Sequence, residues 1–92
     1  MSVIVRVPTI LRSYTGGESE VTGSGATLND VLHDLETRHS GLLTRILDDN
    51  GKIRRFVNIY VNEEDVRFEQ GLETATPAGT NISILAAVAG GL

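Results

Sequence analysis

The residues whose types and position most clearly suggest a chemical role are Gly90 and Gly91, which precede the last residue of the chain. Glycine has no Cβ, so a glycine pair can pass through a narrow enzyme tunnel and lie close against another backbone. At the end of a folded domain, such a thread can present a carboxylate for activation. The alternative interpretation is that glycine is common at exposed chain ends, where it has no function. A dipeptide alone is weak evidence, so the rest of the chain must decide between the two.

Two further groups of polar residues deserve consideration as sites. His33 and His39 do not have the spacing of a helical metal pair, and no carboxylate is placed to complete a site, so we predict a structural role for both. The acidic run at residues 63–65 lacks the interleaved ligands of a calcium loop, so we interpret it as a solvated turn. We therefore predict no catalytic residue, no metal site and no cofactor.

Composition limits the possible partners. The chain has 92 residues, 40% of them hydrophobic and 22% charged, which is typical of one folded domain. Its formal net charge of −4 argues against a nucleic-acid partner, and we interpret the basic run at residues 52–55 as a solvated loop and strand edge. The absence of cysteine excludes disulfides, thiolate metal sites, cysteine nucleophiles and iron–sulfur clusters.

The apolar segments bear on location. The N-terminus lacks the charged start and long apolar stretch of a signal peptide. No apolar run approaches the roughly 18 residues that a membrane span needs. We therefore expect a cytoplasmic protein with no membrane partner.

The N-terminal half predicts two strands and a helix. Residues 2–7 alternate with period two, and residues 18–22 are expected to form a short second strand after a long loop. Thr27 is the expected N-cap of the helix that follows, and residues 42–47 suggest one or two further turns. The apolar stripe of the main helix consists of Leu28, Val31, Leu32 and Leu35. Asp34 and Arg38 are spaced on this helix as an exposed i,i+4 pair.

The C-terminal half predicts two strong strands. Residues 55–62 alternate most clearly, and residues 80–86 form a last strand that runs directly into the tail. Between them we expect a polar reversal at residues 62–65, a short edge strand at most at residues 66–68, and irregular structure over residues 69–79.

The order of these elements predicts an α+β fold with one main helix packed on one face of a mixed sheet. The ubiquitin-like β-grasp is the economical topology for a last strand that leads into a free tail. We expect this domain to cover residues 1–87 and a flexible diglycine tail to cover residues 88–92.

Several stretches carry a resemblance to a known family. They are residues 7–12 (VPTILR), 55–62 (RFVNIYVN), 64–68 (EDVRF) and 81–91 (NISILAAVAGG). In these stretches the chain resembles the ubiquitin-like sulfur carrier proteins of the ThiS and MoaD family, and most closely their CysO branch, which supplies sulfur for cysteine biosynthesis. The resemblance covers most of the chain and implies the β-grasp fold.

The resemblance also implies a function in which the chain is a substrate and not an enzyme. An E1-like enzyme would adenylate the carboxylate of Gly91, and a sulfur donor would convert the adenylate to a thiocarboxylate. A sulfur-accepting biosynthetic enzyme would then use that sulfur as a nucleophile. In this interpretation Val88, Ala89 and Gly90 form the tail that delivers Gly91.

The last residue departs from the family pattern. The mature family members end at the second glycine, whereas this chain continues to Leu92, which places the Gly91 carboxyl group in a peptide bond. Either a protease removes Leu92, as JAMM-type metallopeptidases do for some family members, or Leu92 is a residue left over from cloning.

The second face of the sheet is a candidate docking surface. The residues expected to pack on the helix are Val3, Val5, Val57, Ile59, Ile82 and Ile84. Ile4, Phe56, Tyr60 and Leu85 would then point away from the helix and form a contiguous apolar patch, which on a small protein usually marks a partner site. The alternative is that the loop at residues 9–17 covers this patch.

Two other functions stay open from the sequence. The chain could be a protein modifier that is joined to lysines of other proteins through Gly91. Its single lysine, Lys52, argues against self-linked chains of varied topology but not against single modification. The chain could also be a β-grasp interaction module whose tail is inert.

Overall fold

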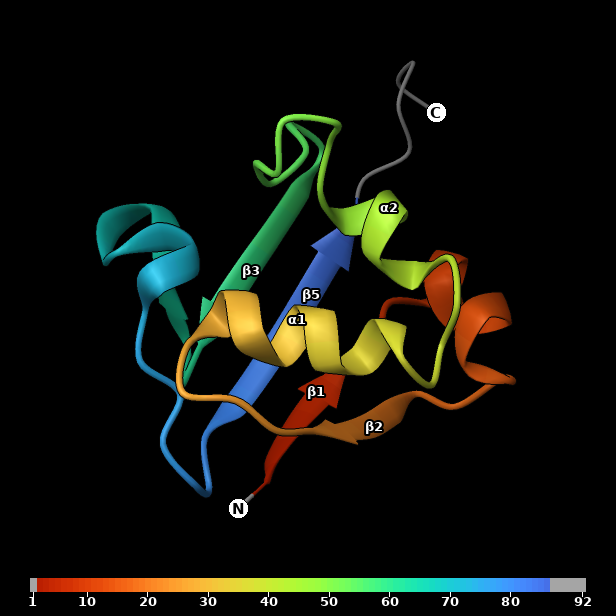
Figure 1. Cartoon of the computed structure of the whole chain (residues 1–92), viewed down its shortest axis with the longest axis horizontal. Helices are drawn as coiled ribbons and strands as arrows, with labels where there is room; N and C mark the ends of the chain where they lie inside the picture. The colour runs from red at the N-terminus through yellow and green to blue at the C-terminus, as the bar shows by residue number, and fades with distance from the viewer. Residues whose placement is uncertain (1, 87–92) are drawn as a thin grey trace.

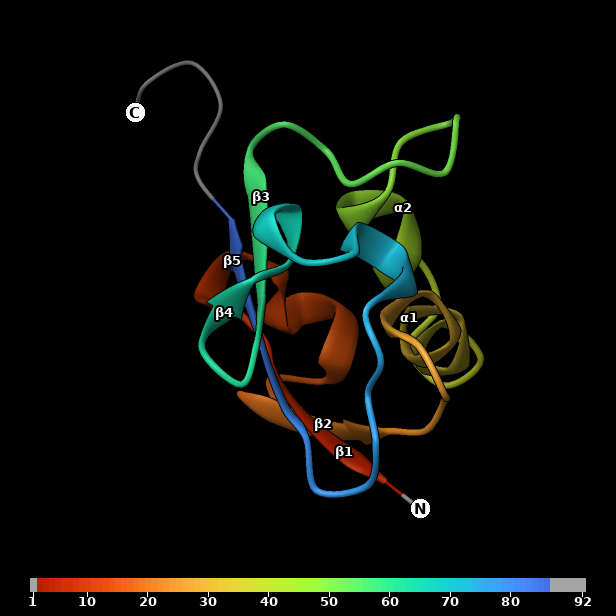
Figure 2. The ribbon, with the colours of Figure 1, turned by 90° about the vertical axis from the view of Figure 1, so that its left-hand side faces the viewer.

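The computed structural model describes residues 2–86 and contains a five-stranded mixed sheet with its two α-helices on one face (Figures 1 and 2). The strands lie in the order β2-β1-β5-β3-β4. Their bounds are Val3–Arg6 (β1), Glu20–Gly23 (β2), Val57–Val61 (β3), Glu64–Asp65 (β4) and Asn81–Ala86 (β5). β1 and β5 are parallel, and the other three neighbouring pairs are antiparallel. This is the predicted ubiquitin-like β-grasp arrangement.

Helix α1, Leu28–Glu36, begins where the sequence predicts it to begin. The side chain of Thr27 accepts a hydrogen bond from the Asp30 amide at 3.2 Å, which satisfies one of the free donors of the first turn. Helix α2, Leu42–Ile46, follows after a turn at Gly41, whose φ of 93° favours glycine. The described residues contain no helix that is long and apolar enough to cross a membrane.

The core lies between the sheet and α1. The predicted inward-facing residues of β1, β3 and β5 are all buried, as is the complete apolar stripe of α1. The buried strand residues include Val3, Val5, Val57, Ile59, Ile82 and Ile84. The periodicity of the sequence therefore identified both surfaces of this core correctly.

Two segments differ from the sequence-based expectations. Residues Thr9–Thr15, expected as a loop, form a 3₁₀ helix that buries Leu11 in the core and contacts α2. Residues Val66–Phe68, expected to form an edge strand at most, form another 3₁₀ helix, and the edge strand is instead β4. A tight reversal at Asn62 and Glu63, both with positive φ, brings β4 back earlier than expected, and Asp65 then accepts a hydrogen bond from the Arg67 amide at 2.9 Å.

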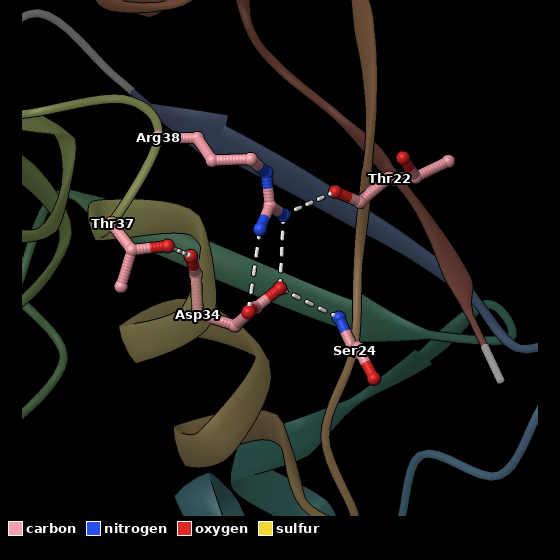
Figure 3. Close-up of polar contacts among 5 residues, drawn as sticks. All are labelled: Thr22, Ser24, Asp34, Thr37 and Arg38. Carbon is pink, nitrogen blue, oxygen red and sulfur yellow. Dashed lines mark hydrogen bonds and ion pairs between the residues drawn. The ribbon is translucent and has the colours of Figure 1, made fainter.

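The exposed edge of β2 is held by two side chains of the α1 region (Figure 3). Val7 N–H donates to Ser19 O at 2.9 Å, so the register directs the backbone groups of Thr22 away from β1. Arg38 donates to Thr22 O at 2.8 Å and to the Asp34 carboxylate at 2.9 Å, and Asp34 accepts from the Ser24 amide at 2.9 Å. These bonds join the helix to the sheet and occupy edge groups on which another strand could pair.

This arrangement predicts a pH-dependent contribution to stability. The hydrogen bond from Arg38, followed by that from the Ser24 amide, holds the pKa of Asp34 below its usual range. A carboxyl group with a lowered folded-state pKa stabilises the fold above its unfolded pKa of about 4, and this contribution is lost as the pH falls through the folded-state value. The Asp34–Arg38 coupling is expected to be about 0.5 kcal/mol near neutral pH, because the pair is partly exposed.

A double-mutant cycle measures this coupling. The free energy of unfolding is measured for the wild type, Asp34→Asn, Arg38→Gln and the double variant, near neutral pH and below the folded-state pKa of Asp34. We expect the coupling energy to disappear on acidification. A coupling of equal size at both pH values would show that the charge of Asp34 is not its source.

Candidate functional site

The outer face of the sheet carries three of the four predicted docking residues on its strands. Ile4 of β1 and Leu85 of β5 are 42% and 50% exposed, and Tyr60 of β3 is half-buried. Each alternates along its strand with buried residues, so it points away from α1 as expected. Phe56, which is 44% exposed, lies in the turn just before β3. The 3₁₀ helix Thr9–Thr15 does not bury these residues, because it packs into the core through Leu11.

The register shows that these four residues do not form one contiguous patch, contrary to the sequence-based expectation. Tyr60 pairs with Ser83, so Leu85, two residues further along β5, is its diagonal neighbour. Ile4 pairs with Asn81 at the opposite end of β5, and Arg6 and Ser83 form the row between Ile4 and Leu85. Which positions of β1 and β5 stand side by side is a long-range property, and residue alternation does not reveal it.

Strand β5 ends at Ala86, which pairs with Val57 of β3. The predicted site residue Gly91, the predicted tail residues Val88, Ala89 and Gly90, and Leu92 lie outside the described residues. The domain boundary at residue 87 therefore stays a prediction. What the structure establishes is the position of the last described strand: β5 lies between β1 and β3 and is hydrogen-bonded to both.

A groove of about 590 Å³ lies beside this point. Its lining includes Ile10, Tyr14, Arg45, Arg54, Phe56 and Ala86. Apart from Phe56, sequence reasoning did not mark these residues as part of a site. The one available indication was the spacing of three residues between Leu11 and Tyr14, which matches the period of a 3₁₀ helix.

Two arginines of the groove, Arg45 and Arg54, are each held by a hydrogen bond that their Nε donates. Arg45 Nε donates to the Tyr14 hydroxyl at 2.6 Å, and its guanidinium carbon lies 5.5 Å from the centre of the Tyr14 ring. Arg54 Nε donates to the carbonyl oxygen of Thr44 in α2 at 2.8 Å. The terminal nitrogens of both guanidinium groups carry further N–H groups, which can donate hydrogen bonds to an anion.

Two histidines and one glutamate outside the groove form hydrogen bonds with the backbone near α1. His33 Nδ1 lies 2.9 Å from the carbonyl oxygen of Asn29, and the backbone amide of His39 donates to Leu35 O at 2.8 Å. The Glu36 carboxylate accepts bonds from the amides of Gly41 and Leu43, which hold the pKa of Glu36 below its usual range. Within residues 2–86 no cluster of histidine and carboxylate side chains is arranged to hold a metal ion.

Comparison with known proteins decides the family. The profile of the ThiS family matches residues 5–91. The chain belongs to the ThiS family. It is 55% identical over 93 residues to "Sulfur carrier protein CysO" of Mycobacterium tuberculosis, an alignment that covers 99% of this chain and 100% of that one.

Two further relatives extend this comparison. One chain of the solved structure "Crystal structure of Amycolatopsis orientalis BexX/CysO complex" matches with a TM-score of 0.90 at 49% identity, covering 97% of this chain and 99% of that chain. "Small archaeal modifier protein 3" of Haloferax volcanii is 38% identical over 66 residues, which cover 72% of this chain and 71% of that one. The family membership and the β-grasp fold expected from the resemblance are thus both confirmed.

Proposed function

We propose that the protein is a sulfur carrier that carries its cargo as a thiocarboxylate on Gly91. The observation that supports this most strongly is the 55% identity, over nearly the whole chain, to the sulfur carrier protein CysO. The diglycine at Gly90 and Gly91 supplies the chemical group that such a role needs. The chain itself performs no catalysis in this proposal, and it acts in the cytoplasm.

The chemistry proceeds in two steps. A carboxylate is a poor electrophile, so an E1-like enzyme first joins the Gly91 carboxylate to the α-phosphorus of ATP and releases pyrophosphate. A donor then supplies sulfur at the oxidation level of sulfide: hydrosulfide attacks the acyl carbon, the bond to the phosphate oxygen breaks, AMP leaves with its electron pair, and a thiocarboxylate remains. The thiocarboxylate is ionised at neutral pH and nucleophilic through sulfur, so an acceptor enzyme can use it directly. Cysteine biosynthesis is the pathway that we favour, because the CysO resemblance implies it.

The fold supports delivery of the tail. Because β5 is anchored on both sides, the tail starts from a fixed point, and a partner that binds the domain has a defined distance to the end of the chain. We infer that partners dock on the outer face near the end of β5, through Leu85, Tyr60 and Phe56. Ile4 would contact only a partner that also covers the far end of this face.

Leu92 must be absent before activation. We propose removal by a peptidase, for which a JAMM-type metallopeptidase is the candidate, unless Leu92 is a cloning residue. Either origin leaves the same requirement, which is a free carboxylate on Gly91.

A second candidate function is conjugation to other proteins. One relative bears the name small archaeal modifier protein 3, and it would share the adenylation of a C-terminal glycine. The two functions diverge after adenylation, because a lysine amine, instead of a sulfur donor, would attack the acyl carbon.

Intact-mass analysis of the protein purified from its native host distinguishes these functions. We expect a population that ends at Gly91 and carries the mass change of one oxygen replaced by sulfur. Attachment of the chain to lysines of other proteins, without any thiocarboxylate, would favour the modifier. A population made up only of unmodified chains ending at Leu92 would contradict both.

A further inference from the structure

The basic residues of the chain fall into two groups. Arg6, Arg38 and Arg67 each form a salt bridge, with Glu20 at 3.5 Å, Asp34 at 2.9 Å and Asp65 at 2.8 Å respectively. The other five form no salt bridge with any residue in the part of the chain that the structure describes. These five are Arg12, Arg45, Lys52, Arg54 and Arg55. Within residues 2–86, most of the cations thus form no salt bridge, although the chain has a net charge of −4.

Two of these five cations line the groove beside the end of β5, and no acidic residue in the described part of the chain lines it with them. Hydrogen bonds from the backbone amides of Lys52 and Asn50, and then the charges of Arg54 and Lys52, hold the pKa of Asp48 below its usual range, but Asp48 does not line the groove. The groove also offers apolar surface, because Ile10 and Phe56 are 51% and 44% exposed. It therefore combines two fixed guanidinium groups with two exposed hydrophobic side chains.

We propose that this groove receives a segment of the activating enzyme in which carboxylate side chains flank an apolar one. The guanidinium groups of Arg45 and Arg54 bind the carboxylates, and Ile10 and Phe56 contact the apolar side chain. Arginine suits this role because its planar group can bind a carboxylate through two parallel hydrogen bonds. This inference rests on the proposed function, since it concerns the enzyme that adenylates Gly91.

The position of the groove favours this occupant. Ala86 is both a lining residue and the last described residue of β5, so an enzyme that takes up the tail must pass beside the groove. Charge complementarity at such a place increases the rate of association and fixes the orientation of the partner. A nucleic acid is disfavoured because the net charge of −4 opposes a polyanion.

The test compares two variants with the same change in net charge. In Arg45→Gln/Arg54→Gln the groove loses both cations, whereas Arg67→Glu changes the net charge equally at a residue that does not line the groove, in the 3₁₀ helix after the edge strand β4. The dissociation constant for the purified adenylating enzyme of the same organism is measured without ATP, using chains that end at Gly91. At low salt we expect about a tenfold weaker affinity for the groove variant, a change below about twofold for Arg67→Glu, and a smaller difference at high salt.

Two additional proteins keep the test decisive. Arg45→Lys/Arg54→Lys retains both charges, and it should bind the enzyme more tightly than the glutamine variant does. If the glutamine variant is poorly folded, the lysine variant is compared with the wild type instead, and its loss of two-bond contacts should weaken binding. Chains that end at Ala86 should show the same dependence on the two arginines, because the groove acts on the enzyme and not on the tail.

Several results would overturn the proposal. Equal losses in the groove variant and in Arg67→Glu would indicate a general charge effect. Loss of the arginine dependence in chains that end at Ala86 would indicate that the groove holds the chain's own tail. Binding of a single-stranded oligonucleotide that requires the arginines, with unchanged affinity for the enzyme, would indicate a nucleic-acid site. Arginine-dependent binding to an enzyme that never forms a thiocarboxylate would leave this inference standing and contradict the proposed function.

Discussion

A chain that ends at Gly91 is expected to be adenylated by its activating enzyme, whereas the chain that retains Leu92 is expected to be unreactive. The reason is chemical: the peptide bond to Leu92 removes the carboxylate that must attack ATP. We expect the rate of ATP-dependent pyrophosphate release to differ by at least about a thousandfold, since the free carboxylate of the longer chain belongs to Leu92, one branched residue beyond the reacting position. Pyrophosphate release and the intact mass of the product measure the two halves of this prediction.

A chain that ends at Gly90 is the matched control. It has a free glycine carboxylate, but that carboxylate stands about 3.5 Å short of its normal place. We expect it to bind the enzyme normally and to react about a hundredfold more slowly than the chain ending at Gly91, because the reaction depends on position. Full reactivity of the Leu92 chain, without prior trimming, would be incompatible with activation at Gly91.

The second large effect is expected on the outer face of the sheet. Leu85→Ser and Phe56→Ser should each weaken affinity for the activating enzyme by about 30-fold, which corresponds to the roughly 2 kcal/mol contributed by a buried apolar anchor. Both side chains are exposed in the free protein, at 50% and 44%, so they are available to a partner. The same exposure should leave the free energy of unfolding nearly unchanged.

Phe68→Ser provides the control for this prediction. Phe68 is the most exposed of the large hydrophobic side chains of residues 2–86, at 82%, but it belongs to the 3₁₀ helix that follows β4. Its replacement should alter affinity by less than about twofold, as is usual for a contact outside the centre of an interface. Equal effects of Phe68→Ser and Leu85→Ser would show that general hydrophobicity, and not the outer face, determines binding.

The elements that could be predicted are those whose own periodicity defines them. β1, β3 and β5 alternate along their length, and α1 carries a complete apolar stripe with a Thr27 cap, so local rules identify both the elements and their buried faces. The 3₁₀ helices Thr9–Thr15 and Val66–Phe68 are short and follow neither period, so the sequence alone suggested a loop and an edge strand.

The candidate site also has one part that local sequence predicts and other parts that only the packing of the chain creates. The diglycine is a local motif, and it was visible in the sequence, although it lies beyond the described residues. The basic groove is not local: it brings together Tyr14, Arg45, Arg54 and Ala86, which come from different elements, and only their packing makes them neighbours. The interrupted outer face was missed for a related reason, because the stagger between β1 and β5 is set by the whole sheet.

The central place of β5 has a mechanical consequence. A pull on its C-terminal end acts along the strand, so the hydrogen bonds to β1 and β3 are loaded together in shear and cannot be opened one after another. The domain should therefore resist traction at this end of β5. An enzyme of the proposed kind would then be able to pull on the following residues without unfolding the sheet.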